Sequence, residues 1–109
     1  MSSEIPPQSH ARLLEHRVRL SIAALLARHD EISFSRFKQL LGETDGSLGA
    51  QLRKLEDAGM VTARKEFRDR RPVTWYSLTP AGRRSLRAHL DALRALIRIA
   101  DRSGTREDR

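Results

Sequence analysis

The chain has 109 residues, enough for one modest domain with a single hydrophobic core. It carries 21 lysines and arginines against 14 aspartates and glutamates, and this net charge of +7 favours a polyanionic partner such as nucleic acid or an acidic membrane surface. The absence of cysteine excludes disulfides, thiolate metal sites and thiol nucleophiles, and no apolar run is long enough to span a bilayer. The polar N-terminus does not have the form of a signal peptide, so a cytoplasmic protein is expected.

The ordered domain is expected over residues 10–100, between two disordered tails. Residues 1–9 are polar with paired prolines, and residues 101–109 lack large apolar side chains. A first helix is predicted over residues 10–28, because apolar residues recur there at helical spacing. These residues are Leu14, Val18, Ile22 and Leu25.

Two short helices joined by a tight turn are predicted next. Ser33 is the expected N-cap of a helix over residues 34–41, and Gly42 suits the left-handed position that closes it. Thr44 is the expected N-cap of a second helix over residues 45–57. A turn of about three residues between two such helices is typical of a helix-turn-helix.

A β-hairpin with a basic tip follows, and then one long helix. The strands are predicted over residues 60–67 and 73–78, on either side of a polar turn. Thr79 and Pro80 are a cap and a first helical residue, and they predict a helix over residues 80–100. The fold class is therefore mainly α with a small β-hairpin, a winged helix-turn-helix with a long C-terminal helix.

The sequence resembles the small bacterial winged-helix DNA-binding domains related to the ArsR- and MarR-type transcriptional regulators. The matching stretches are Val18 to Ile22, Ile32 to Phe34, Leu40 to Gly42, Leu52 to Val61 and Tyr76 to Gly82. The resemblance implies a DNA-binding regulator. It does not imply an operator sequence, because Gly49 and Gln51 stand where the family commonly has a polar residue and a histidine.

The helix over residues 45–57 is the candidate recognition helix. If its leucines face inward, the N-terminal part of the outward face holds only small side chains, which would let the backbone approach the floor of a DNA groove. Gly49 costs roughly 1 kcal/mol in mid-helix relative to alanine, which suggests a local reason for it. A solvated face with a tolerated glycine is the alternative. The predicted base contacts are Ser47, Gln51 and Arg53.

The hairpin over residues 64–74 is the candidate basic wing. Residues 64–71 hold five positive and two negative side chains, and arginines there can touch phosphates or enter the minor groove. A charged hairpin that only prevents edge-to-edge strand pairing is the alternative. Together with the helices, the predicted backbone or minor-groove contacts are Arg36, Lys38, Lys54, Arg68, Arg70 and Arg71.

The last helix has an apolar seam at heptad spacing, which predicts a homodimer. This helix carries more apolar surface than a three-helix core needs, although packing on the first helix alone would also use the seam. The predicted interface residues are Leu86, Leu90, Leu93, Leu96 and Ile97.

These features predict a homodimeric transcriptional regulator that binds double-stranded operator DNA. The alternative is a non-enzymatic protein–protein interaction module on a winged-helix scaffold, which would not need the basic wing. The sequence contains no catalytic constellation, and His89 and Asp91, which fall close together on the last helix, do not form a metal-ligand set. No enzymatic activity, cofactor, metal or membrane partner is therefore expected, and no particular small-molecule effector is indicated.

Overall fold

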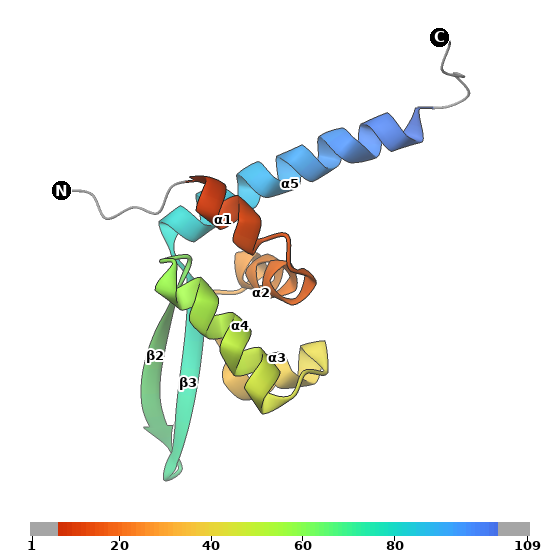
Figure 1. Cartoon of the computed structure of the whole chain (residues 1–109). Coiled ribbons are helices and arrows are strands. Elements are labelled where there is room, and N and C mark those ends of the chain that lie inside the picture. Colours follow the sequence, from red (N-terminus) through yellow and green to blue (C-terminus); the bar gives the residue numbers. More distant parts are fainter. Residues whose placement is uncertain (1–6, 103–109) are drawn as a thin grey trace, which may run out of the picture.

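A computed structural model describes residues 7–102, which form a helical body from which a hairpin and one long helix project (Figure 1). The elements, in chain order, are α1 (Pro7–Leu13), α2 (Arg17–Arg28), β1 (Ile32–Ser33), α3 (Phe34–Leu41), α4 (Asp45–Asp57), β2 (Val61–Arg68), β3 (Arg71–Leu78) and α5 (Pro80–Asp101). The winged helix-turn-helix with a long C-terminal helix is confirmed. None of the helices in this part of the chain is long and apolar enough to cross a membrane.

The prediction of one first helix over residues 10–28 was wrong, because the chain forms α1 and α2 with a break between them. The His16 side chain accepts a hydrogen bond from the backbone N–H of Val18 and caps the start of α2. Arg19 donates from Nε to the carbonyl oxygen of Leu13 at 2.7 Å, which satisfies the end of α1. The two helices are therefore capped separately, although their apolar residues share one helical period.

The ends of the ordered region also differ from the expectation. α1 begins at Pro7, inside the expected N-terminal tail, and α5 includes Asp101. The remainder of the two expected tails, residues 1–6 and 103–109, lies outside the described residues.

The sheet has three strands in the order β1-β3-β2, all antiparallel, and β1 was not predicted. This strand has only two residues, and Ile32 and Ser33 pair with Tyr76 and Trp75. The β2–β3 hairpin, called the wing from here on, is longer than predicted. Its strands pair as far as Arg68 and Arg71, and only Asp69 and Arg70 form the turn.

The core lies where α2, α3, α4 and the base of the wing meet. Its largest fully buried side chains are Phe37, Leu14, Ile22, Leu26, Leu48, Leu52, Leu55 and Met60. The three leucines of α4 are among them, as the expected inward face of that helix requires. Burying side chains of this size is the main favourable term in holding the helix-turn-helix against the sheet.

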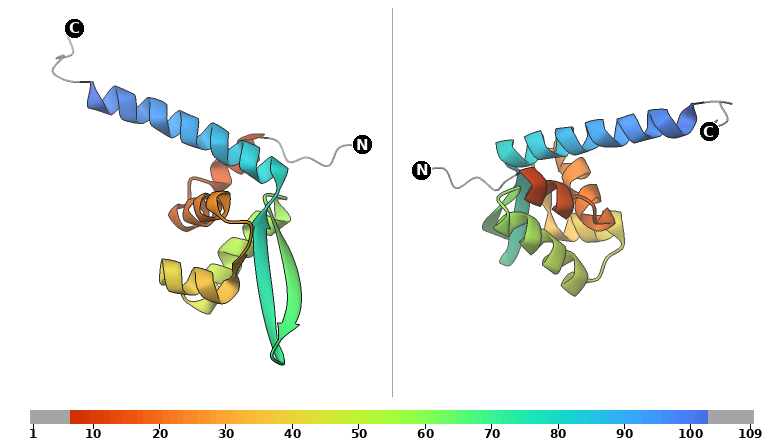
Figure 2. Two further views of the ribbon diagram at one scale, coloured as in Figure 1. Left: turned by 180° about the vertical axis from the view of Figure 1, so that it is seen from behind. Right: turned by 45° about the horizontal axis from the view of Figure 1, so that its top comes forward.

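α5 is anchored at its N-terminal end and projects at its C-terminal end. Thr79 caps the helix and donates from Oγ1 to the carbonyl oxygen of Gly59 at 2.7 Å. Gly82 lies directly against the carbonyl of Met60, where no Cβ would fit. Leu86 completes the core, and beyond it the helix runs away from the body (Figure 2).

Candidate nucleic-acid interface

α3 and α4 form the predicted helix-turn-helix, and local side chains fix its geometry. The Ser33 hydroxyl accepts from the backbone N–H of Arg36, and the Thr44 hydroxyl accepts from that of Ser47, each at 3.1 Å. Gly42 closes α3 with φ of 66°, a left-handed conformation that costs glycine little. The predicted caps and turn are confirmed, so α4 leaves the turn in a direction set by its own sequence.

On the outward face of α4, glycines leave the backbone exposed near the N-terminus, and basic side chains follow further along. Around Gly46 and Gly49 an added Cβ would meet nothing within 4 Å. Neither glycine is therefore required by packing among residues 7–102. Arg53 and Lys54 are exposed, and neither side chain makes an ion pair or hydrogen bond within this range.

The three predicted base contacts lie in different environments. Ser47 donates from Oγ to Glu43 Oε1 at 2.6 Å. Gln51 is only partly exposed, and its Oε1 accepts from Arg19 Nη1 at 2.6 Å. Arg53 alone has an uncommitted polar group. Arg19 of α2 therefore holds the Gln51 side chain at the buried edge of the helix.

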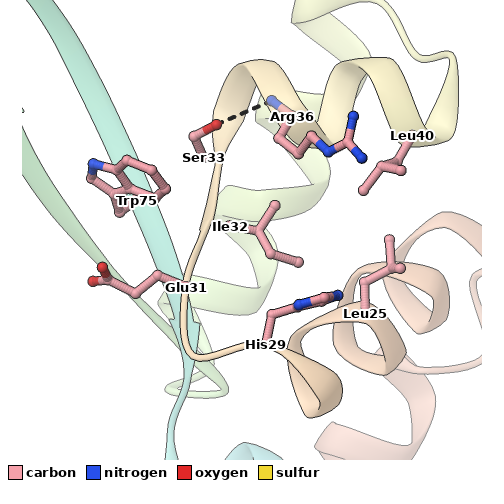
Figure 3. A pocket seen from close by; sticks show the side chains of 8 residues that line it. All are labelled: Leu25, His29, Glu31, Ile32, Ser33, Arg36, Leu40 and Trp75. Carbon is pink, nitrogen blue, oxygen red and sulfur yellow. Dashed lines mark hydrogen bonds between the residues drawn. The ribbon is translucent and has the colours of Figure 1, made fainter.

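The two predicted phosphate contacts on α3 point to different neighbours. Lys38 forms an ion pair with Asp45 at 2.6 Å, and this pair links α3 to the first turn of α4. Arg36 is exposed, donates from Nη1 to Gln39 Oε1 at 3.1 Å, and borders a groove beside β1 (Figure 3). A phosphate at Lys38 would thus compete with a carboxylate, whereas one at Arg36 would not.

One face of the wing is held by a charge network that the sequence did not reveal. Arg64 donates from Nε and Nη2 to the two carboxylate oxygens of Glu31, at 2.9 and 2.7 Å, and from Nη1 to Glu66 at 2.9 Å. The indole Nε1 of Trp75 donates to the other oxygen of Glu66 at 2.9 Å. Hydrogen bonds from Arg64 lower the pKa of both carboxyls, and those to Glu31 and Glu66 raise the pKa of Arg64.

Some arginines of the wing interact with this network, whereas those at its tip do not. Arg68 lies 3.7 Å from Glu66 and stacks over the Trp75 ring, with its guanidinium carbon 5.6 Å from the ring centroid. The side chains of Arg70 and Arg71, at the tip, make no ion pair or hydrogen bond within the described part of the chain. Within the described residues, the two guanidinium groups at the tip therefore have no ion-pair partner, whereas the strands behind the tip are held by the charge network.

The wing tip also carries an exposed aromatic side chain that was not predicted from the sequence. Phe67 is 77% exposed and lies opposite Pro72 in the hairpin register. It is on the strand face opposite to Arg68, because successive strand residues point to opposite sides. Alternation along β2 places Phe67 on the same face as the buried Val61, so the available signal for its exposure was its position beside the hairpin turn, six residues along the strand from Val61.

The predicted dimer residues on α5 fall into a buried and an exposed group. Leu86 is 3% exposed and belongs to the core of its own chain, so placing it in an interface was wrong. Leu90 packs partly on the core, and Leu93 is half-buried. Leu96 and Ile97 are 60% and 57% exposed, in the part of the helix that leaves the body.

Comparison with known proteins agrees with this geometry. The family described as winged helix DNA-binding domain matches residues 18–97. The chain belongs to this family. It is 38% identical over 66 residues to an uncharacterized protein of Methanocaldococcus jannaschii, a match that covers 61% of this chain and 72% of the other.

Solved structures extend the likeness over most of the chain. A transcriptional regulator homologue from Pyrococcus horikoshii OT3 is 32% identical, with a TM-score of 0.77 over 83% of this chain and 89% of that one. A protein described as a MarR-family regulator from Porphyromonas gingivalis W83 is 18% identical, with a TM-score of 0.63 over 95% and 97%, and shares the fold. The class is thus that of winged-helix, DNA-binding transcriptional regulators.

Proposed function

We propose that the protein regulates transcription as a cytoplasmic homodimer that binds double-stranded operator DNA through α4 and the wing. The observation that carries this proposal is the set of uncompensated cations on these two projecting elements. Arg53 and Lys54 lie on α4, and Arg70 and Arg71 lie at the wing tip. A recognition helix in the major groove and a wing on the flanking backbone would bring all four to the polyanion.

The roles of these cations follow from their positions. Arg53 has a free guanidinium on the outward face of α4, where it can donate two hydrogen bonds to a guanine. Arg70 and Arg71 are at the end of the hairpin, where phosphates or a narrow minor groove attract arginine. Arg36, Lys38, Lys54 and Arg68 supply further backbone contacts in this proposal, and Ser47 and Gln51 supply weaker base contacts.

Dimerisation is proposed on the exposed apolar end of α5. Two-fold symmetry would place two recognition helices about one DNA turn apart, to match a palindromic operator. The apolar residues that leave the body of one chain would be covered by the second copy. They are Leu93, Leu96 and Ile97, with Leu90 at the edge.

The first test uses a duplex selected by the protein from a random-sequence pool, with affinity measured by fluorescence anisotropy. If the protein neutralises phosphates, log K should fall with log salt by about 0.9 per contacted phosphate, and we expect about six contacts or more for a dimer. Affinity that stays constant between roughly 50 and 200 mM salt would exclude this mode of binding.

Two variants then distinguish contacts with DNA bases from contacts with the DNA backbone. Arg53→Ala should change the order of preference among duplexes, since one good base contact discriminates by about 1–3 kcal/mol. The double variant Arg70→Ala, Arg71→Ala should weaken all duplexes by similar factors and lower the salt slope. Arg12→Ala on α1 removes an exposed arginine that has no place in the proposed interface and is the matched control. A uniform loss in Arg53→Ala would make Arg53 a phosphate contact.

A further inference from the structure

A groove of about 470 Å³ lies between α2, β1, α3 and the wing, on a part of the surface that the proposed DNA contacts leave largely unused. Its size is within the range of small-molecule sites. Figure 3 shows its lining, which comes from α2, β1, α3, β3 and the loop between α2 and β1. The lining residues are Leu25, His29, Glu31, Ile32, Ser33, Arg36, Leu40 and Trp75.

The larger part of the groove surface is apolar. Leu25 of α2 and Leu40 of α3 face each other across it, and Ile32 lies between them and the wing (Figure 3). Leu40 is 43% exposed, so the chain leaves part of this apolar surface uncovered. The Trp75 indole nitrogen points away from the groove to Glu66, so the indole contributes carbon surface on this side.

The polar groups of the groove favour an anion. Glu31 is the one carboxylate of the lining, and Arg64 binds both of its oxygens. The Ser33 hydroxyl is occupied as the cap of α3. Arg36 remains as a permanent charge with one hydrogen bond to Gln39. The His29 imidazole lies beside Leu25 in the same lining and offers a further hydrogen-bond donor (Figure 3).

We propose that this groove binds a small organic anion, a carboxylate on a ring or short apolar chain, with its head group on Arg36 and its body against Leu25, Leu40 and Trp75. A carboxylate takes two parallel hydrogen bonds from a guanidinium, and the exposed leucines and indole are covered by the apolar part. Arg36 is also a proposed phosphate contact, so the anion would compete with DNA. That consequence rests on the proposed function, whereas the binding site itself does not.

Binding is tested first without DNA. Trp75 is the only tryptophan of the chain, so its indole N–H gives a single resonance that reports from the wall of the groove. We expect phenylacetate to shift this resonance saturably, with a dissociation constant in roughly the millimolar range that suits a fragment of this size. Phenylacetamide, which has the same shape without the charge, and acetate, which lacks the ring, should bind at least about fivefold more weakly at equal ionic strength.

Two substitutions locate the site. Arg36→Gln should weaken phenylacetate at least about tenfold, because the charge-assisted pair is lost. Arg28→Gln removes an exposed charge next to His29 that does not line the groove, and it should leave the affinity unchanged. Equal binding of phenylacetamide, no saturable shift, or an affinity indifferent to Arg36→Gln would each overturn the proposal.

The consequence for DNA is tested by competition on the selected duplex. Saturating phenylacetate should weaken DNA binding by wild type at least about threefold and have no effect on Arg36→Gln, since coupling between two ligands is reciprocal. Unchanged DNA affinity at saturation would remove the regulatory step. Failure to bind any duplex would contradict the proposed function and leave the result of the resonance titration standing.

Discussion

Gly49 stands in the middle of α4 with open space around it. The Cβ of an alanine there would meet no heavy atom within 4 Å apart from its chain neighbours and the nearby backbone of α4, and it would favour the helix by about 1 kcal/mol. We therefore expect Gly49→Ala to raise the free energy of unfolding by about 0.5–1 kcal/mol in urea denaturation. If the backbone at Gly49 approaches the groove floor, the same variant should bind the selected duplex less tightly.

The two expected effects have opposite signs, since the free energy of unfolding should rise while the affinity for DNA falls. A loss of DNA affinity in a more stable protein cannot come from misfolding. A variant that is stabilised and binds DNA as tightly as wild type would show that Gly49 lies away from the bases, and that the glycine is merely tolerated.

His10 joins three helices at a buried point. Its ring is 3% exposed, with Nε2 3.0 Å from the carbonyl oxygen of Ala58 and Nδ1 2.5 Å from the Ser85 hydroxyl. A carbonyl can only accept, so Nε2 donates to Ala58, and Nδ1 lies at hydrogen-bond distance from the Ser85 hydroxyl. His10→Ala would leave both partners unsatisfied, and we expect a loss of roughly 2 kcal/mol in the free energy of unfolding.

Two further variants show whether the loss comes from the hydrogen bonds. His10→Gln can keep the donor to Ala58 and should recover part of the loss. Arg12→Ala, at an exposed position of the same helix, should change the free energy of unfolding by less than about 0.5 kcal/mol. An equal loss in Gln and Ala variants would mean that packing of the ring, and not its hydrogen bonds, holds α1.

At the scale of elements, local signals predicted the helix-turn-helix and the start of α5. Ser33, Thr44 and Thr79 each cap a helix through a hydrogen bond to a backbone N–H three residues on. Gly42 ends α3 for a reason that is also local. Because each of these features depends on a few neighbouring residues, the sequence alone was sufficient for them.

Features that depend on distant contacts were missed. α2 begins after a break and is capped by His16. Because histidine is not one of the usual capping residues and the apolar spacing continues across the break, the sequence predicted one helix there. The strand β1 exists only because the wing pairs with it. The Glu31–Arg64 pair joins residues far apart in the chain, and it left Arg70 and Arg71 as the free arginines of a segment whose charges look alike in the sequence.

The wing network makes a pH-dependent prediction. Arg64 lowers the pKa of Glu66, and the Trp75 indole N–H lowers it further. The charged form is thus favoured in the folded state, so this stabilisation is present above the pKa of the unfolded chain and is lost as the pH falls through the lower folded value. The Trp75 indole resonance should titrate with a midpoint below about 4.3, the ordinary value for glutamate.

Substitution of the partner tests the cause of this shift. Arg64→Gln should move the midpoint up towards the ordinary value, because the positively charged donor that binds Glu66 is replaced by a neutral side chain. Lys65→Gln, on the other face of the wing, is the control and should leave it in place. An unshifted midpoint in Arg64→Gln would assign the effect to Trp75 and Arg68.

At the scale of the whole molecule, one apolar stripe of α5 packs on the core at its start and is exposed further along. The molecule measures 66 × 39 × 23 Å, and a helix of 22 residues is about 33 Å long, so α5 extends past the body (Figure 2). The first part of the stripe, at Leu86 and Leu90, packs on the core. Its continuation at Ile97 has no cover within the described chain. The heptad spacing indicated the stripe, but only the position of the body shows where its role changes.

The exposed part of this stripe gives the test of dimerisation. Ile97→Asp should leave the fold intact, because Ile97 is 57% exposed, and it would place two like charges in the seam of a two-fold dimer. Each buried side chain of this type contributes about 1.5–3 kcal/mol, so we expect sedimentation equilibrium to show a monomer at micromolar concentration and operator affinity to fall steeply. Ala88→Asp adds the same charge at an exposed position on the opposite side of the helix and should remain dimeric. A wild type that is monomeric at micromolar concentration, or an Ile97→Asp protein that stays dimeric, would remove the end of α5 from the interface.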